Sequence, residues 1–562
     1  MIKATPRIWY SLVTAAVLGV GGLASALPAQ GSAVVPQGQH QASTQARAAN
    51  PDRAVFTKAL VTDLRKSGFQ VNPGYPMVLG PDSCKAYTYP LLKDCFGNNP
   101  AGGYANAVVK AWPHEQVGPT PPDVLGQVDP GYTPIYRLGT RDALVFYGQM
   151  PPPGRYMGWQ TFLWSQPGRW KAKDYNRVAS IPNRPWPLQY RFHTIPPNDP
   201  NANRVFSQSS VGDIVNNVVM QRKSGDSWGK NRYFITTPSA TTDQAVRSAL
   251  HALGVPDSDI FTEQIPSRDA YGPIGPLGMG KNAIDFWSTF RYAIPDNQAA
   301  AKQWWQTLPL TVLRVRAPSS LGPVHRYGML TYEKQTTPHP EAYLKGDMQD
   351  LVNAVCQRTS SVLGLKSADC TQPPPASSFM VNQYTDYGWT GPYCRSIHMW
   401  CGDQNDIGAG TTTPRPLDSG QVYAVVDTLA TETGNATYVG LGVNDASTFF
   451  APTGVNDLQL KGSADQYAAT VNNAGKFFVH YFTRNCDTAQ MKALVGENRL
   501  SEDCTSITED MVPPKWKTTA LGDPALHGMF FPILRDYIAP GTARGPDQSK
   551  LLTGRVLSFT KP

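Results

Sequence analysis

The sequence predicts an α+β fold, a large mixed body of sheet and helix built as two lobes and stapled by local disulfides. Pro (50 residues) and Gly (49 residues) together form about 18% of the 562 residues, where about 12% is usual. This share favours many turns over a helical bundle. Apolar runs typical of strands alternate with amphipathic helical segments along the chain, and eight Cys fall into four neighbouring couples.

The composition excludes several classes of protein. Apolar residues make up 41% of the chain and charged residues 16%, against a usual charged share of about 25%, so neither a disordered chain nor a coiled coil is indicated. The net charge of +8 is spread thinly, and no block of five or more Lys or Arg marks a nucleic-acid-binding face. No internal repeat of fixed period is visible.

Strand and helix patterns can be located along the chain. The interval 233–237, a helix begun by Thr241 or Thr242, and 259–262 predict a small βαβ unit. The alternating run 311–316 predicts a half-exposed strand, and a turn at 434–435 joins two further strands. The other predicted strands are 143–147, 156–164, 421–429, 438–441 and 477–482, and the other predicted helices are 211–220, one capped by Asp296, and 341–363.

The N-terminus has the pattern of a secretory signal. Lys3 and Arg7 precede a short apolar stretch, and 24–26 is a small-residue cleavage pattern. We expect residues 1–26 to be removed and the protein to be secreted, extracellular or periplasmic, with an uncleaved anchor as the alternative. Residues 27–53 read as a flexible leader, or as a processed pro-segment. The predicted lobes are 54–338 and 339–562, although one continuous body is also compatible, and no later stretch is apolar enough to span a membrane.

The eight cysteines lie after the predicted signal, and an even number in an exported chain favours disulfides. Closing short loops costs the least entropy, so we expect neighbours to pair. None of the couples has the CxxC spacing of a zinc site, and no metal site is predicted from them. The expected pairs are Cys84 with Cys95, Cys356 with Cys370, Cys394 with Cys401, and Cys486 with Cys504.

The segment 225–229 matches the GxSxG pattern of serine hydrolases, with Ser227 at the nucleophile position. A nucleophile elbow needs a strand before the turn and a helix after it. Here a helical segment comes before and a strand follows, so we interpret the match as a surface turn. No Walker-type loop and no HExxH motif occurs, and the sequence leaves any cofactor undecided.

The densest group of polar and aromatic residues lies between positions 384 and 406. His398 is the candidate acid or base, because its reference pKa is near neutrality. Carboxylates could orient His398 or divide the acid and base roles between them, and a small disulfide loop would hold the group rigid. The candidate catalytic residues are His398, Asp403, Asp406 and Asp386, and the candidate substrate-binding residues are Trp389, Tyr393, Arg395 and Trp400.

Other interpretations of this segment stay open. The same residue types form structural loops whose side chains bond their own backbone, and a calcium-stabilised loop is a third possibility, although the EF-hand pattern fails. Weaker candidates are His325 and the group of His527 with Arg535 and Asp536. His480 lies in an apolar strand, where a side chain facing the core would be neutral and paired.

Two classes of function follow from these observations. The first is a secreted hydrolase that acts on a polymeric or ester-like extracellular substrate by acid–base chemistry. The second is a non-enzymatic exported protein whose aromatic residues bind a glycan or a partner. The length slightly favours an enzyme, because a simple binding module needs about 100–150 residues. The two classes differ in geometry, since an enzyme should line a concave pocket and a binder should present a shallow aromatic patch.

Overall fold

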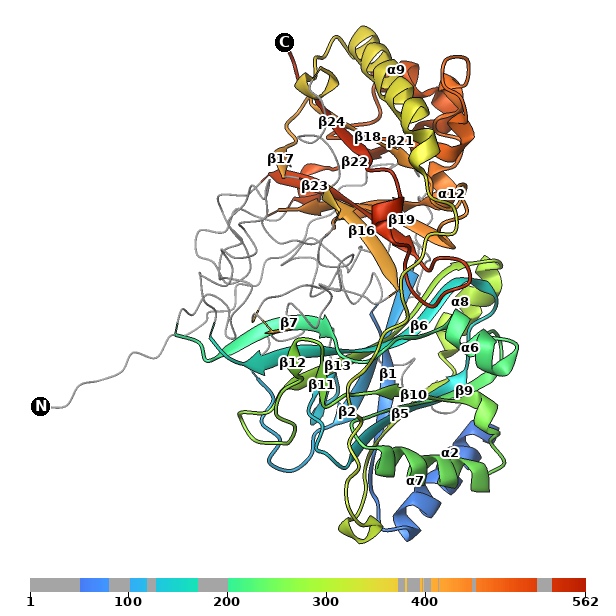
Figure 1. The fold of residues 1–562 in the computed structure, drawn as a ribbon, viewed down its shortest axis with the longest axis vertical. Helices are drawn as coiled ribbons and strands as arrows, with labels where there is room; N and C mark the ends of the chain where they lie inside the picture. Colours follow the sequence, from blue (N-terminus) through green and yellow to red (C-terminus); the bar gives the residue numbers. More distant parts are fainter. Residues whose placement is uncertain are drawn as a thin grey trace, which may run out of the picture. The chain divides into compact units, whose positions relative to one another are not determined.

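Twelve strands between Gln70 and Arg316 form the largest sheet (Figure 1). The computed structural model describes residues 51–79, 102–118, 128–169, 201–371, 380–381, 395–396, 398, 406–412, 414–446, 451–512 and 528–562. Along the main path of this sheet the strand order is β10-β9-β5-β14-β1-β2-β13-β6-β7. These strands are β1 (Gln70–Leu79), β2 (Gly102–Lys110), β5 (Asp142–Gln149), β6 (Gly154–Pro167), β7 (Arg204–Ser210), β9 (Asn231–Thr237), β10 (Ile260–Gln264), β13 (Asp285–Pro295) and β14 (Leu310–Arg316), with the short strands β3 (Tyr132–Thr133), β4 (Ile135–Tyr136) and β8 (Val215–Asn216) beside them.

Aromatic residues fill one face of this sheet. The ring of Phe146 on β5 stacks on Trp159 of β6 with 4.2 Å between centroids, and on Phe290 of β13 with 5.9 Å. Helix α8 (Gln298–Thr307) adds Trp304 and Trp305 to the same cluster. Burying such large rings is a main source of stability for a sheet of this size.

The βαβ prediction is confirmed. Strands β9 and β10 pair in parallel, and α7 (Ala240–Ala252) connects them. Val246 and Leu250 are buried on the sheet as their spacing predicts. Helix α2 (Pro51–Lys66) lies beside α7 (Figure 1). Helix α7 begins two or three residues earlier than expected, because the side chain of Ser239 accepts from the backbone of Thr242 and caps it.

Three local predictions were wrong. The segment 211–220 is not one helix, since β8 interrupts it and Asn216 caps α6 (Asn217–Ser224). Asn297, not Asp296, caps α8. The strand at 311–316 is not half-exposed, because the buried guanidinium of Arg314 is neutralised by Glu115 inside the protein. Alternation of apolar and basic residues therefore did not mean alternation of core and solvent here.

Two smaller sheets follow in the C-terminal part of the chain. The six-stranded sheet comprises β15 (Met380–Val381), β16 (Ile407–Thr411), β17 (Arg415–Pro416), β19 (Tyr438–Asp445), β20 (Thr453–Asn456) and β23 (Met529–Tyr537). The four-stranded sheet comprises β18 (Val422–Thr428), β21 (Phe477–Thr483), β22 (Cys504–Ser506) and β24 (Arg555–Phe559). Strands β18 and β19 lie in different sheets, so the turn at 434–435 does not join a hairpin.

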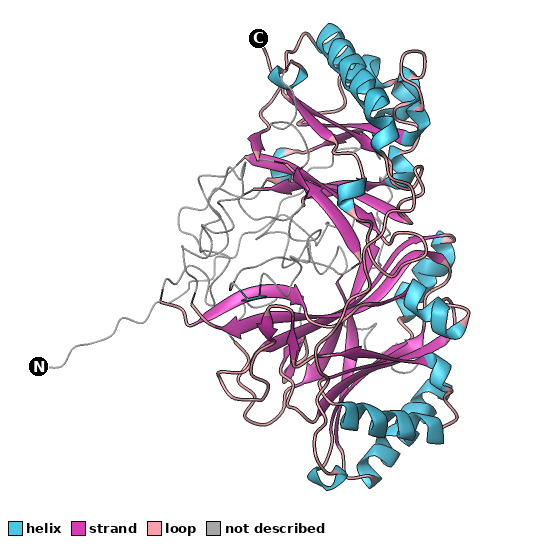
Figure 2. Cartoon of the chain, in the orientation of Figure 1, coloured by secondary structure: helices cyan, strands magenta, loops and turns pink. Residues whose placement is uncertain are grey.

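The two smaller sheets pack face to face. Apolar side chains of β18, β21 and β24 meet those of β19 and β23 in one core, which includes Val425, Phe478 and Leu534. On the other face of the four-stranded sheet lie α9 (Lys345–Leu363) and α13 (Ala489–Val495), as Figure 2 shows. The short helices α12 (Asp457–Leu460) and α14 (Leu500–Asp503) and the hairpin β11 (Arg268–Asp269) with β12 (Gly272–Pro273) complete the elements used below.

Two of the four predicted disulfides lie within the described residues, and both are confirmed. Cys356 pairs with Cys370 and Cys486 with Cys504, across 14 and 18 residues of sequence. A cross-link of this loop length stabilises a protein by about 3 kcal/mol through the unfolded chain. The couples Cys84 with Cys95 and Cys394 with Cys401 lie outside the described residues.

The α+β prediction is also confirmed, since helices accompany large mixed sheets. Strands before residue 317 and strands after residue 379 form separate sheets, and the expected boundary near residue 338 falls between them. Residues 32–562 form one compact unit, so the division into lobes stays a prediction. No helix among the described residues is long and apolar enough to cross a membrane.

Candidate active site

Two aspartates, one from each of the smaller sheets, have their side chains between these sheets. Asp427 belongs to β18 and Asp536 to β23, and 3% of each is exposed. Along β18, Tyr423 and Val425 point into the core between the sheets, and the alternation of a strand places Asp427 on the same side. On β23, Leu534 points into the same core, and the same alternation places Asp536 on that side of its sheet. Two carboxyl groups from different sheets therefore meet in one apolar core.

The two carboxyl groups line a small pocket. Its cavity volume is about 20 Å³, which is room for one or two water molecules. Thr553 on its wall is exposed, and Leu551 and Leu552 are half-buried, so the pocket lies near the surface. The lining residues are Gly410, Asp427, Thr428, Leu534, Asp536, Gln548, Leu551, Leu552, Thr553 and Gly554.

Hydrogen bonds hold both carboxyl groups in place. The backbone N–H of Thr428 donates to Oδ1 of Asp427 at 2.7 Å, and Gln548 Nε2 donates to Oδ2 of Asp536 at 3.0 Å. Oδ1 of Asp536 is buried and receives no hydrogen bond. Glu341 lies behind the pair, where the hydroxyl of Thr428 and the backbone N–H of Leu552 donate to it. The described ion pairs give none of these three carboxyl groups a cationic partner.

The environment of the pair favours the neutral acid. Burial raises the pKa of Asp427 well above its ordinary value, and Glu341 and Asp536 raise it further. Burial raises the pKa of Asp536 to about 7, the bond from Gln548 opposes the rise, and Glu341 adds to it. Removing a carboxylate from water disfavours its charged form, and a neighbouring carboxylate does the same. The pair therefore retains protons at pH values where ordinary aspartates have lost them.

Two glycines make room for this arrangement. A Cβ atom at Gly554 would lie 2.1 Å from Oδ2 of Asp427, and one at Gly408 would lie 2.1 Å from Nε2 of Gln548. Any other residue at either position would displace the carboxyl group or the amide that holds its partner. The backbone is thus fitted closely around the acid pair.

This geometry is suited to proton transfer. A carboxyl group whose pKa lies near 7 can take a proton from water at neutral pH, and a neighbour that stays neutral can donate one. The free Oδ1 of Asp536 and the small cavity are the place for such a water. Within the described residues no group of three potential metal ligands occurs.

The sequence did not predict that Asp427 and Asp536 form a pair. Asp536 was noted beside His527 only as a weak candidate, and Asp427 was counted as part of a strand. The available indication was a carboxylate inside an otherwise apolar strand, because such a group must be paired or neutral. Nothing in the sequence indicates that two such strands bring their carboxyl groups together.

The structure places three of the predicted site residues in separate surroundings. Arg395 forms two bonds to the Asp269 carboxylate, at 2.9 and 2.8 Å, so its guanidinium is already occupied. His398 lies against Gly168, just beyond the end of β6. Asp406 lies at the opposite end of β6, near Tyr156, with its carboxylate 3.9 Å from Arg291. The structure therefore does not bring Asp406 to His398.

The remaining predicted residues of this segment are Asp386, Trp389, Tyr393, Trp400 and Asp403. They lie outside the described residues, as do Cys394 and Cys401. Their proposed roles in catalysis and substrate binding stay predictions.

The pKa of Asp406, the described aspartate of this segment, is raised by burial, and the charge of Arg291 opposes the rise.

The predicted order of elements around Ser227 is confirmed, but its side chain is buried and does not lie on the surface, and His480 has the core environment that was one of its two alternatives. Ser227 lies between α6 and β9, in the order helix, turn, strand, and its hydroxyl donates to the carbonyl of Asn217. It is 2% exposed, so this is a buried, bonded serine and not a nucleophile at an elbow. His480 faces the core and contacts the Thr505 hydroxyl, and burial lowers its pKa to about 3.

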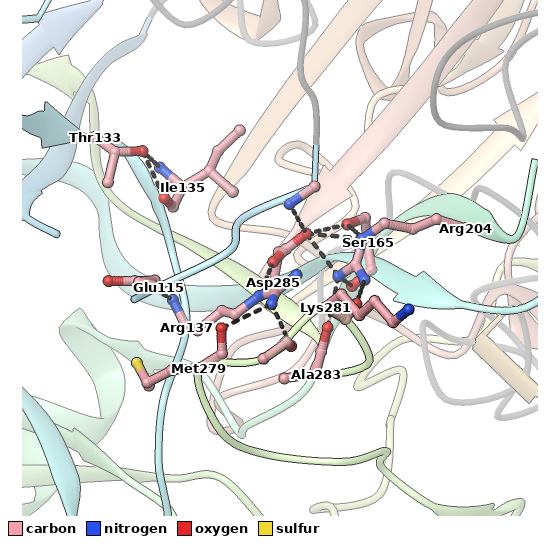
Figure 3. Close-up of polar contacts among 12 residues, drawn as sticks. Glu115, Thr133, Ile135, Arg137, Ser165, Arg204, Met279, Lys281, Ala283 and Asp285 are labelled. Carbon is pink, nitrogen blue, oxygen red and sulfur yellow. Dashed lines mark hydrogen bonds and ion pairs between the residues drawn. The ribbon is translucent and has the colours of Figure 1, made fainter. Parts of the chain in front are cut away.

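Another buried carboxylate, that of Asp285 on β13, has the opposite arrangement. Arg137 Nε donates to its Oδ1 at 2.6 Å, and Arg204 lies 2.6 Å from its Oδ2 (Figure 3). The hydroxyl of Ser165 and the backbone of Gly118 complete its bonds. Each oxygen of this carboxylate accepts from an arginine, so it has the environment of a structural ion cluster.

No protein-family model and no curated protein matches this chain. Five solved chains match it in structure, and two of them, at low identity, are the following. One is the VPA0106 protein from Vibrio parahaemolyticus, with 9% identity, 75% of this chain and 87% of that chain covered, and a TM-score of 0.30. The other is an uncharacterized protein from Burkholderia cenocepacia, with 8% identity, 82% and 77% covered, and a TM-score of 0.32.

Proposed function

We propose that this protein is an exported hydrolase that activates water with the Asp427–Asp536 pair. The observation that carries the proposal is a pair of buried carboxyl groups, without a cation among the described ion pairs, on the wall of a cavity of water size. Strongly perturbed acids in a pocket are a frequent mark of catalytic sites. The substrate is a polymer or an ester-like compound whose scissile bond reaches the pocket beside Thr553.

The two carboxyl groups take different roles. Asp536, whose pKa is raised to about 7, is the base that removes a proton from the water. Asp427, whose pKa is raised well above its ordinary value by burial and by Glu341 and Asp536, keeps its proton and donates it to the leaving group. Because the groups are coupled, the measured pKa values belong to the pair.

Export is supported by two kinds of observation. The disulfides Cys356–Cys370 and Cys486–Cys504 are typical of oxidising compartments, and residues 1–26 have the pattern of a secretory signal. Sequencing the N-terminus of protein from the culture medium tests this part. A mature chain that begins at Met1 inside the cell would contradict it.

The catalytic proposal is tested with a panel of chromogenic esters, glycosides and peptides. Asp536→Asn and Asp427→Asn should each lower kcat/KM by about 100-fold or more, because acid–base catalysis contributes 10²–10⁴-fold. In the wild type, kcat/KM should rise as the pH passes about 7. Asp350→Asn, on the exposed side of α9, is the matched control and should leave kcat/KM unchanged.

Two results of this substrate panel would overturn the proposal. Full activity in either pocket variant would remove the pair from the mechanism. Failure to hydrolyse any of the three bond classes would count against a hydrolase altogether.

A further inference from the structure

Glu341 is a third buried carboxyl group beside the acid pair, and the mechanism above gives it no role. It lies just before α9 and is fully buried. Each of its oxygens accepts two hydrogen bonds, all from neutral donors. Oε1 accepts from the Thr433 hydroxyl at 2.6 Å and Asn435 Nδ2 at 2.9 Å, and Oε2 accepts from the Thr428 hydroxyl at 2.8 Å and the Leu552 backbone N–H at 2.9 Å.

These four donors favour the ionised form of Glu341. Asn435 is held in its orientation because its Oδ1 accepts from the backbone N–H of His339, so its Nδ2 stays directed at Oε1. The backbone N–H of Leu552 is fixed at the other oxygen. A proton added to either oxygen would therefore meet a donor that cannot turn away. Hydrogen bonds donated to a carboxylate stabilise its charge, and Asp536, with one such bond at Oδ2 and none at Oδ1, lacks this support.

Thr428 connects Glu341 to the acid pair. Its Oγ1 lies 2.8 Å from Oε2 of Glu341 and 3.4 Å from Oδ1 of Asp427. A hydroxyl has one proton, and the shorter contact assigns that proton to Glu341. The Thr428 hydroxyl therefore cannot also stabilise a negative charge on Asp427. A single hydroxyl separates the two carboxyl groups, so a charge on one acts strongly on the other.

The charge of Glu341 acts on both members of the pair. Burial is the largest cause of the raised pKa of Asp427, and Glu341 comes next, ahead of Asp536. Burial is also the largest cause of the rise in the pKa of Asp536 to about 7, which the bond from Gln548 opposes and Glu341 increases. Geometry and charge therefore agree that Glu341 makes a second negative charge in this core unfavourable.

The other charged or titratable side chains described around the pair point away from it, have other partners, are exposed or are neutral. Arg535 alternates with Asp536 on β23 and lies on the other side of that strand. His480 on β21 faces the same core, but burial lowers its pKa to about 3, so it is neutral at pH 7. The rest are Arg555, which donates to the Asp369 carbonyl, Asp457, which pairs with Arg155, Asp547, which bonds Ser549, and the exposed His339 and Lys550.

We propose that Glu341 is a positioning residue of the acid pair: it stays ionised, and its fixed negative charge keeps the proton on Asp427 and opposes the ionisation of Asp536. Its part in catalysis rests on the proposed function, whereas its charge and its effect on Asp536 are measurable without a substrate. With the charge in place the pair exchanges protons near neutral pH. Without it the same pair would do so at more acidic pH.

The charge itself is tested on the full chain labelled with [5-13C]glutamate. The sequence contains eight glutamates, and Glu341→Asp and Glu263→Gln each identify one carboxyl signal by its disappearance. Between about pH 6 and about pH 8 the signal of Glu341 should keep the position of an ionised carboxylate. The signal of Glu263, whose pKa burial raises to about 7, should titrate in this range. A protonated Glu341 at pH 7 would overturn the proposal, whatever the variants of the pair do.

The effect on the pair is tested with Glu341→Gln, which removes the charge and keeps the size. Both limbs of the plot of kcat/KM against pH should move to lower pH by about one unit or more, because both acids lose a like-charged neighbour. Glu341→Asp keeps the charge and should keep the limbs near their wild-type positions. Glu509→Gln makes the same change at an exposed position and is the matched control. A residue with only a structural role would change activity or melting temperature without moving the limbs, so unmoved limbs in Glu341→Gln would overturn the proposal.

A measurement without substrate keeps this test separate from the test of hydrolysis. The difference in unfolding free energy between the wild type and Asp536→Asn gives the contribution of Asp536 at each pH. In the Glu341→Gln background its decline should end at a lower pH than in the wild-type background. An unchanged end point would overturn the positioning role. Full activity of Asp427→Asn and Asp536→Asn with a shifted end point would instead remove the hydrolase and leave the action of Glu341 on Asp536 in place.

Discussion

Buried carboxyl groups have two kinds of bonding partners in this molecule. In the first sheet, Asp285 lies between Arg137 and Arg204, and Glu115 pairs with Arg314 through both of its oxygens. Between the two smaller sheets, Asp427 and Asp536 face a pocket with hydroxyl and amide partners only. A paired carboxylate keeps its charge and holds strands together, whereas an unpaired one must keep its proton to stay buried. The second arrangement is the one that can exchange protons near neutral pH.

The same substitution, acid to amide, should have unlike effects in the two regions. Asp285→Asn leaves Arg137 and Arg204 buried with no counter-charge, which should lower the free energy of unfolding by about 3–5 kcal/mol. Denaturant unfolding at neutral pH measures this loss. A loss below about 1 kcal/mol would mean that water reaches the ion cluster, and the contrast between the two regions would then fail.

Glu263 separates the effect of the partner from the effect of the region. It belongs to the first sheet, like Asp285, but the described hydrogen bonds give it no arginine partner. The backbone of Thr161 and the hydroxyls of Thr161 and Thr236 donate to it, and burial raises its pKa to about 7. A neutral amide of the same shape should substitute for a protonated acid. We expect Glu263→Gln to change the free energy of unfolding by less than about 1 kcal/mol at mildly acidic pH. A loss as large as that of Asp285→Asn would show that this carboxylate is charged in the folded protein.

Particular residues show what the sequence could predict. The βαβ unit was found because Val246 and Leu250 repeat at helical spacing between two apolar runs, and two disulfides followed from the short loops they close. These are local patterns. The starts of α7 and α8 were missed by one to three residues, because several neighbouring polar residues could serve as caps.

The acid pair could not be predicted, because it depends on the packing of two sheets. Asp427 and Asp536 are 109 residues apart in sequence, and only the shared core of β18 and β23 brings them to one pocket. The segment around His398 was predicted to be the active site because its polar and aromatic residues are close in sequence. Nearness in sequence does not settle which groups meet, as the separation of Asp406 from His398 shows.

The sign of the pH dependence follows from the raised pKa of Asp536. In the unfolded chain this carboxyl loses its proton near pH 3.8, and in the folded protein near pH 7. Between these values the folded state holds a proton that the unfolded state has released. The contribution of Asp536 to stability is therefore largest at low pH and declines as the pH rises through this window, by on the order of 4 kcal/mol.

The most direct measurement is the free energy of unfolding against pH for the wild type and Asp536→Asn. Taking the difference removes the contribution of all other groups that titrate alike in both proteins. We expect the wild type to lose several kcal/mol of unfolding free energy relative to the variant between about pH 4 and about pH 7. Parallel curves would show that Asp536 is ionised throughout, and would contradict the acid pair.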